Sequence, residues 1–248
     1  MSGTAKWRMG VSIGFNPLAK EGPANMSALY NKLYEEPAYG VPETALYLRV
    51  PYNTLRYWLT GFQKMPPMIL PAETDPVRLS FLNLLECHVL AGMRKIYNLK
   101  LPKVRRALAK IGEQYPQQHP LVSEAFFTDR TDLFIEKLGK LVNVSQHGQM
   151  GLNFYRMHLE RVQIDPKGMF RFFPFVSETS PTEPKLIEIN PMVGFGKPVI
   201  AGTGISTAII ASRFNARESI ADLAAEYGCS APQIEEAIRW ERALPIAA

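Results

Sequence analysis

Cysteine is almost absent from this chain of 248 residues, which contains only Cys87 and Cys229. The two residues are far apart and in unlike contexts, which argues against a disulfide framework and against a zinc site. Long apolar runs are missing as well, since no stretch of about eighteen apolar residues exists that could form a transmembrane helix. Lys6 and Arg8 near the N-terminus are not followed by the apolar segment of a secretory signal. We therefore expect a cytoplasmic protein without membrane contact.

Motifs that support catalysis are also missing. The histidines are dispersed, and none has a second ligand at a metal-binding spacing. No GxSxG, P-loop or paired-carboxylate motif occurs. The glycines of segment 194–204 do not follow the P-loop order, so turn glycines ahead of a helix explain them better than a phosphate cradle. We expect no enzyme activity, no metal site and no cofactor.

Positive charge is concentrated in one half of the chain. The formal net charge is +5, of which residues 1–120 contribute +7 and residues 121–248 contribute −2. Nucleic acids attract clustered lysine and arginine side chains. Any contact with nucleic acid is therefore predicted in the N-terminal half.

Residues 41–60 predict two short helices on either side of a tight turn. The first helix covers Glu43–Leu48, and Val50–Pro51 breaks it. In the second helix Leu55, Trp58 and Leu59 share one apolar face. Its outward side chains resemble those that a helix-turn-helix presents to the major groove of DNA. These candidate DNA-binding residues are Tyr52, Asn53, Arg56 and Tyr57.

Two following segments extend this candidate DNA surface. Gly61–Arg78 contains four prolines around Met68–Leu70, which forbid a helix and favour a hairpin or wing, although a plain linker is possible. Lys64 and Arg78 lie near its ends, where they could reach phosphates. A helix beginning at Pro102 and running to about Gln114 has a basic side, which is either simply solvated or in contact with nucleic acid. That side includes Lys103, Arg106 and Lys110.

The segment from Leu79 to Tyr97 predicts one long helix. Its apolar residues recur three, four, four and three positions apart, as in the seam of a coiled coil. We expect this seam to pair two protomers in a homodimer. The seam consists of Leu82, Leu85, Val89, Met93 and Ile96.

The C-terminal half has a different pattern of predicted secondary structure. Residues 121–190 contain short β-prone runs, including 126–127, 133–135, 141–144 and 169–176, together with a possible helix at Gln149–Val162. Downstream lie a strand at Ile187–Pro191 and three short helices with a glycine-containing turn, which form a second unit similar to a helix-turn-helix. We expect that unit to bind protein rather than DNA, because Glu235 and Glu236 would face phosphates with the wrong sign.

The expected fold is α+β and mainly α. It has an N-terminal winged helix-turn-helix, a small central mixed β-sheet and a C-terminal three-helix unit. The predicted organisation is a flexible arm at 1–36, a DNA-binding region with the dimerisation and basic helices at 37–120, the β region at 121–190 and the three-helix unit at 191–248.

Two stretches resemble known families. Residues 41–60, with the run Thr-Leu-Arg-Tyr-Trp at 54–58, resemble a MerR-type winged helix-turn-helix together with residues 78–86. Residues 188–205 are similar to the opening of a domain family of unknown function numbered 433, although Gly204 stands where that family usually has arginine. Together with residues 146–149, this layout resembles the larger VapB-type antitoxins. From the MerR-type motif, the resemblance implies that Thr54, Arg56 and Tyr57 lie against the DNA backbone.

The resemblance implies a homodimeric antitoxin with two partners. As a repressor it would bind its own operator DNA, and as an antitoxin it would neutralise a PIN-like ribonuclease toxin. The alternative is a stand-alone MerR-like transcription regulator whose C-terminal half oligomerises or senses a ligand.

Overall fold

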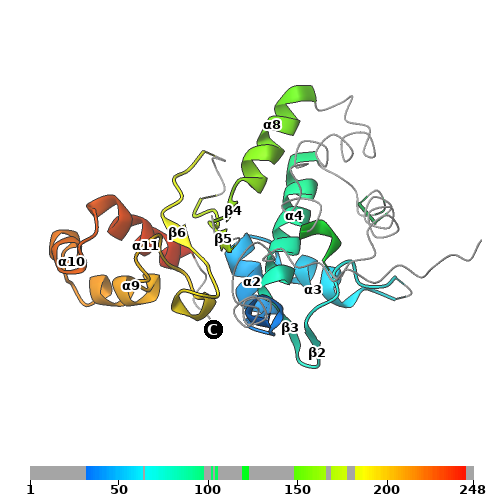
Figure 1. Cartoon of the computed structure of the whole chain (residues 1–248), viewed down its shortest axis with the longest axis horizontal. Coiled ribbons are helices and arrows are strands. Elements are labelled where there is room, and N and C mark those ends of the chain that lie inside the picture. The colour runs from blue at the N-terminus through cyan, green and yellow to red at the C-terminus, as the bar shows by residue number, and fades with distance from the viewer. Residues whose placement is uncertain are drawn as a thin grey trace, which may run out of the picture.

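The structure of the chain is a computed structural model that describes residues 32–63, 65–97, 102, 104–105, 119–122, 148–165, 169–177 and 182–243. This part of the chain is α+β and mainly helical (Figure 1). None of its helices combines the length and the apolar character needed to cross a bilayer. Most of the predicted N-terminal arm and the β-prone runs at 126–127, 133–135 and 141–144 lie outside the described residues.

Two short helices form close to their predicted bounds. Helix α2 covers Val41–Leu48 and helix α3 covers Tyr52–Thr60. Between them Arg49 adopts a left-handed conformation with φ of 53°, which closes α2. The predicted apolar face of α3 is confirmed, since its three large apolar side chains are at most 2% exposed and lie in the core. These side chains are those of Leu55, Trp58 and Leu59.

The hairpin after α3 lies further along the chain than predicted. Strand β2 (Glu73–Thr74) pairs with β3 (Val77–Leu79), and β1 (Tyr39–Gly40) pairs with the other edge of β3. The placement of a strand at Met68–Leu70 was wrong. The backbone N–H groups of Met68 and Ile69 donate to the Trp58 carbonyl, and the Ile69 side chain is buried, so this segment packs on the end of α3.

Helix α4 (Phe81–Tyr97) forms the centre of the core and packs against α8 (Gly148–Leu159). Helix α8 confirms the helix predicted at Gln149–Val162. The side chains of Leu85, Val89 and Met93 are fully buried inside the chain, and Leu82 is partly buried. A heptad-like spacing requires an apolar partner but does not say which chain supplies it. Here α4 packs on α8 of the same chain, and Leu85, Val89 and Met93 are buried within the chain.

The central strands pair differently from the mixed sheet that was predicted. Strand β4 (Val162–Ile164) and strand β5 (Phe170–Phe172) are antiparallel, as are β6 (Ile187–Glu188) and β7 (Val199–Ile200). A bridge between Phe172 and Ile189 joins the two pairs. Every pairing among the described strands is antiparallel. The connection between β4 and β5 is too short for the crossover that a parallel pair requires.

The C-terminal unit contains three short helices, as predicted. They are α9 (Thr207–Asn215), α10 (Ile220–Tyr227) and α11 (Ala231–Ala243). Gly228 closes α10 with φ of 64°, which confirms its predicted role as a left-handed terminator. Glu236 was predicted to face outward, but its side chain is 3% exposed and pairs with Arg239. Helix α11 packs on α9, α10 and the β6–β7 pair, and this packing buries Glu236, whereas Glu235 and Arg239 stay exposed.

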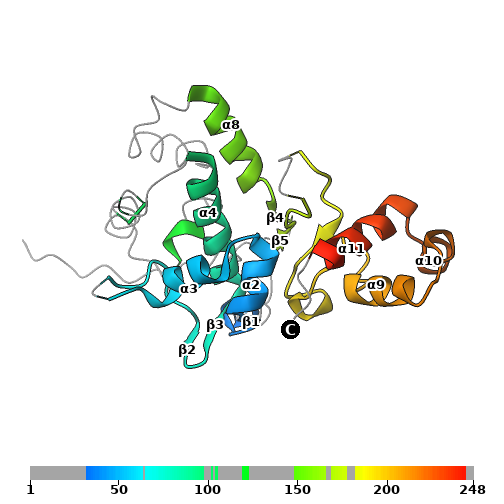
Figure 2. The same cartoon turned by 180° about the vertical axis from the view of Figure 1, so that it is seen from behind.

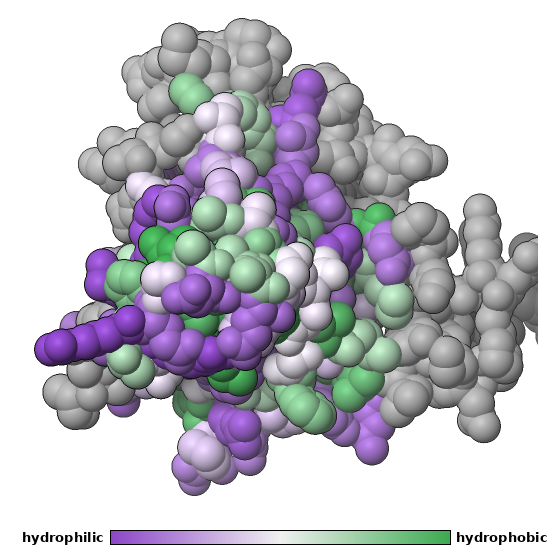
Figure 3. Space-filling model, turned by 90° about the vertical axis from the view of Figure 1, so that its left-hand side faces the viewer, coloured by the Kyte–Doolittle hydropathy of each residue, from purple (hydrophilic) through white to green (hydrophobic). Residues whose placement is uncertain are grey.

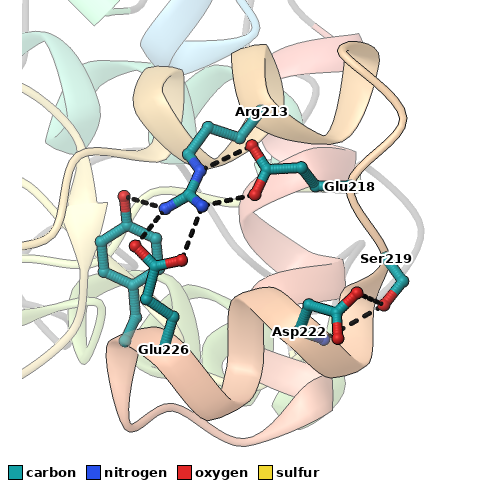
Figure 4. Close-up of polar contacts among 6 residues, drawn as sticks. Arg213, Glu218, Ser219, Asp222 and Glu226 are labelled. Carbon is teal, nitrogen blue, oxygen red and sulfur yellow. Dashed lines mark hydrogen bonds and ion pairs between the residues drawn. The ribbon is translucent and has the colours of Figure 1, made fainter.

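An ion-pair network joins α9 to α10. The Arg213 guanidinium donates to both carboxylate oxygens of Glu218 and of Glu226 and to the Tyr227 hydroxyl (Figure 4). Ser219 caps the start of α10 by accepting from the Asp222 N–H. Seen from this end of the molecule, the surface is mainly hydrophilic around a pale, weakly hydrophobic centre (Figure 3). Acidic side chains therefore occupy the corner where α9 meets α10.

The C-terminal unit lies beside α2, on the side away from α3 (Figures 1 and 2). Arg49 donates to the Ala243 carbonyl at 2.5 Å, and its guanidinium stacks 5.3 Å from the centre of the Trp240 ring. The Tyr47 and Trp240 rings are 5.8 Å apart. These contacts hold the C-terminal end of α11 against α2 and the turn that follows it.

Candidate nucleic-acid interface

An open groove of about 610 Å³ lies where the N-terminal helices, the hairpin and the C-terminal unit meet. Its walls come from the start of α2, the exposed side of α3, the β2–β3 hairpin and the loop before β7. The lining residues are Ala38, Gly40, Val41, Pro42, Glu43, Tyr52, Arg56, Pro76, Val77, Arg78 and Lys197.

The groove carries a positive balance of charge. Its lining contains three cations, Arg56, Arg78 and Lys197, and a single carboxylate, Glu43. The Glu43 carboxylate is already engaged, because it accepts from Lys197 at 2.5 Å and from the Tyr47 hydroxyl at 2.8 Å. The Arg78 guanidinium donates to the Ala38 carbonyl at 3.4 Å, which holds it along the wall of the groove. An anionic ligand therefore fits this groove better than a cationic one.

Local structure explains why these side chains point into the groove. Arg56 is one helical turn after Tyr52, so the two share the face of α3 opposite its buried residues. Arg78 is exposed in β3, whereas the next residue, Leu79, is buried, which is the alternation expected of a strand. Because one face of α3 and one face of β3 are buried, Arg56 and Arg78 on the opposite faces are directed into the groove.

The structure brings together only some of the predicted DNA-binding residues. Tyr52, Arg56 and Arg78 line the groove. Asn53 is exposed beside them at the start of α3, while Thr54 is half-buried. Lys64, Lys103 and Arg106 lie outside the described residues.

Tyr57 is engaged elsewhere. Its hydroxyl accepts from the Arg105 guanidinium at 3.1 Å, and that guanidinium lies 5.3 Å from the centre of the Tyr57 ring. Arg105 also donates to the Pro66 carbonyl at 2.7 Å. The pair therefore joins Arg105 to α3 and to the segment that follows it.

Lys197 was missed by sequence reasoning. It belongs to the C-terminal unit, which has a net negative charge. The distribution of charge therefore predicted nucleic-acid contacts only in the N-terminal half. One local signal exists, since Lys197 is the only charged residue between positions 191 and 205. Its contribution to the groove depends on the docking of this loop against α2.

The interior contains polar groups of a structural kind. The His88 and His158 rings stack 3.9 Å apart in the core, and each Nε2 lies within 2.9 Å of the other residue's carbonyl oxygen. Burial lowers the pKa of both imidazoles, that of His158 to about 4. Within the described ranges, no group of three or more His, Cys, Asp or Glu side chains could hold a metal ion. The two histidines are closed off from any substrate.

Comparisons with known proteins support a family relationship for part of the chain. Residues 187–240 match the family described as "Protein of unknown function (DUF433)", which confirms the resemblance expected from residues 188–205. Over 233 residues the chain is 22% identical to a protein of Mycobacterium tuberculosis (strain ATCC 25618 / H37Rv) named "Putative antitoxin VapB45". That similarity covers 83% of this chain and 94% of the relative.

A solved structure supports the fold. The crystal structure of Rv2018 from Mycobacterium tuberculosis is similar to this chain at a TM-score of 0.59 and 24% sequence identity. The similarity covers 82% of this chain and 98% of that one. The arrangement of the N-terminal and C-terminal parts is therefore found in a second protein.

Proposed function

We propose that this protein is a DNA-binding antitoxin of the VapB type, acting as a repressor of its own operator in the cytoplasm. The observation that carries the proposal is the convergence of Arg56, Arg78 and Lys197 on one groove beside the exposed side of α3. The antitoxin role is supported by the name of the relative that matches most of the chain.

In this proposal α3 reads the major groove and the hairpin acts as a wing. Asn53 and Arg56 have the side chains that pair in a bidentate manner with adenine and guanine edges. Arg78 and Lys197 neutralise phosphates on either side. Tyr52, Thr54, Lys64, Lys103 and Arg106 are further candidate contacts within the region 37–120. A palindromic operator would require a homodimer, whose interface must lie outside the covered α4 seam.

The toxin-binding role is assigned to the C-terminal unit, at 191–248. Its α9–α10 corner exposes acidic side chains, including Asp222 and Glu226, which phosphates would repel. A protein surface tolerates such charges at the rim of an interface. The proposed partner is a PIN-like ribonuclease, which the antitoxin would block by occupying its surface.

Replacing Arg56 by glutamine is expected to weaken operator binding about tenfold, because a charged contact to a base or phosphate is lost. The measurement is fluorescence anisotropy on the DNA upstream of the gene at several salt concentrations. A phosphate contact would lower the salt slope by about one, whereas a base contact would relax sequence preference. Arg217→Gln is the matched control, since it removes one exposed positive charge from the α9–α10 connection. If the wild type and the Arg56 variant bind the DNA with equal affinity, the groove is not part of the DNA-binding surface.

Co-expression tests the antitoxin half of the proposal. Growth arrested by the neighbouring PIN-like gene product is expected to recover when this protein is produced, and a complex of the two should elute together in size-exclusion chromatography. A protein that binds its operator but neither rescues growth nor forms a complex would instead be the stand-alone regulator. Arg56→Gln should leave rescue intact, which separates the two roles.

A further inference from the structure

Phe195 is the most exposed large hydrophobic side chain among the described residues, at 96%. It is the middle residue of the 3₁₀ turn η2 (Gly194–Gly196), directly ahead of Lys197. Its φ of 54° and ψ of 34° are left-handed, a conformation that costs a bulky side chain of order 1–3 kcal/mol. A strained backbone that presents a fully exposed aromatic ring calls for a functional explanation.

The turn is held firmly by its surroundings. A Cβ atom added to Gly196 would lie 2.3 Å from the Tyr39 hydroxyl oxygen, and one added to Gly194 would lie 2.7 Å from Val199 Cγ1. The two glycines, with φ of 74° and 58°, thus let the backbone rest directly on β1 and β7. The Lys197 N–H also donates to the Gly194 carbonyl at 3.0 Å. The Phe195 backbone is therefore fixed relative to the rest of the molecule.

This turn stands at the rim of the basic groove. Lys197 lines the groove, and two residues of chain span at most roughly 7 Å. Tyr39, which lies under Gly196, is flanked in sequence by two residues of the groove wall, Ala38 and Gly40. The aromatic ring and the cations of the groove therefore belong to the same region of the surface.

We propose that Phe195 packs against a base or sugar of the duplex held in the groove, while Lys197 contacts a neighbouring phosphate. This inference rests on the proposed DNA-binding function and extends the DNA surface into the C-terminal unit. In duplex DNA, apolar side chains such as phenylalanine insert between base steps from the minor groove and partly unstack them. A ring on a rigid turn suits this role because little side-chain entropy is lost on binding.

Charge favours duplex DNA over a protein partner at this site. Lys197 is the only charged residue between positions 191 and 205, so this loop itself carries no carboxylate. Its ammonium pairs with Glu43 of α2 at 2.5 Å, and a phosphate would share Lys197 with that carboxylate. Phe195 faces solvent two residues before Lys197, and the groove that Lys197 lines contains two further cations, Arg56 and Arg78. An anchor for a protein partner usually sits in a larger apolar patch, whereas its neighbour Met192 is only 37% exposed.

The test compares full-length variants on the upstream DNA. Phe195→Asn removes the ring and keeps the turn, because asparagine tolerates the left-handed region. Phe195→Tyr retains the aromatic face. Ile209→Asn is the control, since it makes the same replacement at another exposed apolar residue of the C-terminal unit, which is 52% exposed. The readouts are affinity, salt slope and the fluorescence of 2-aminopurine placed at successive positions of the duplex, with thermal unfolding to check folding.

We expect Phe195→Asn to weaken binding about tenfold without changing the salt slope, and Phe195→Tyr to bind as the wild type does. The 2-aminopurine signal should rise at one position with the wild type and not with Phe195→Asn. Lys197→Gln should lower the salt slope by about one.

Separate outcomes identify separate failures. If Phe195→Asn binds DNA as tightly as the wild type while Arg56→Gln does not, the inference is overturned and the proposed function stands. If Phe195→Asn loses only the ribonuclease partner, the ring is a protein anchor and the DNA assignment is wrong. If the wild type itself binds no DNA, both the inference and the DNA-binding function fail.

Discussion

Replacing Arg161 by methionine is expected to lower the free energy of unfolding by about 4 kcal/mol. The Arg161 side chain is 1% exposed, and its guanidinium donates to three backbone carbonyls. These are Phe173 at 2.7 Å, Pro174 at 2.9 Å and Glu183 at 2.7 Å. Methionine fills a similar volume but leaves the carbonyls without donors, and buried acceptors without partners are costly.

The effect of Arg161 should reach the groove. The segment that it holds includes Val176, whose carbonyl accepts from Arg49 at 3.3 Å in the turn between α2 and α3. The guanidinium also lies 4.7 Å from the centre of the Phe175 ring. When this segment loosens, the turn between α2 and α3 loses one of its contacts. The Arg161 variant should therefore bind DNA more weakly than expected from the fraction of protein that remains folded.

Urea unfolding followed by circular dichroism measures the change. Arg217→Met is the matched control on an exposed arginine and should shift stability by less than about 0.5 kcal/mol. Arg161→Lys keeps the charge but reaches fewer carbonyls, so its loss should be intermediate. A stability of Arg161→Met within about 1 kcal/mol of the wild type would contradict a structural role for the three bonds.

Acidification from pH 7 to pH 4 is expected to destabilise the protein through the buried His88 and His158 pair. Burial lowers the pKa of His158 to about 4 and that of His88 well below its ordinary value. In the unfolded chain both imidazoles titrate near 6.5, so below that pH the unfolded state binds protons that the folded state excludes. The stabilising contribution is complete above about pH 6.5 and is lost as the pH falls toward 4. For His158 alone the loss is about 3 kcal/mol.

The double variant His88→Gln/His158→Gln isolates this effect. Urea unfolding of the double variant and of the wild type is measured at pH 7 and at pH 5. The quantity compared is the drop in the free energy of unfolding between these two pH values. Glutamine does not titrate, so the pH-dependent loss should shrink by up to about 1.4 kcal/mol per pH unit for each histidine removed. An unchanged pH dependence in the double variant would assign acid sensitivity to other groups.

Several parts of the candidate site were predictable because they follow from local rules. Tyr52 and Arg56 are exposed since the opposite face of α3 must be buried, and a helix repeats every 3.6 residues. Gly228 ends α10 because glycine enters the left-handed region at little cost. The match of residues 187–240 to a known family likewise depends on sequence alone.

Other features depended on which segments meet. The apolar spacing along α4 predicted an apolar partner, and within the chain α4 packs against α8, a helix more than fifty residues further along the sequence. Glu236 was predicted outward from the pattern of α11, but that helix is covered on more than one side. The spacing of apolar residues along a helix predicts which face is buried, but it does not predict which element covers that face.

The sequence by itself determined the helices α2 and α3, their exposed basic residue Arg56 and the concentration of positive charge in residues 1–120. Only the tertiary structure decided that Lys197, from the oppositely charged half, lines the same groove, with Phe195 two residues before it in the chain. The physical reason is that helical periodicity acts over a few residues, whereas Lys197 reaches the groove through the docking of the C-terminal unit on the α2–α3 region, where Arg49 and Tyr47 contact Trp240.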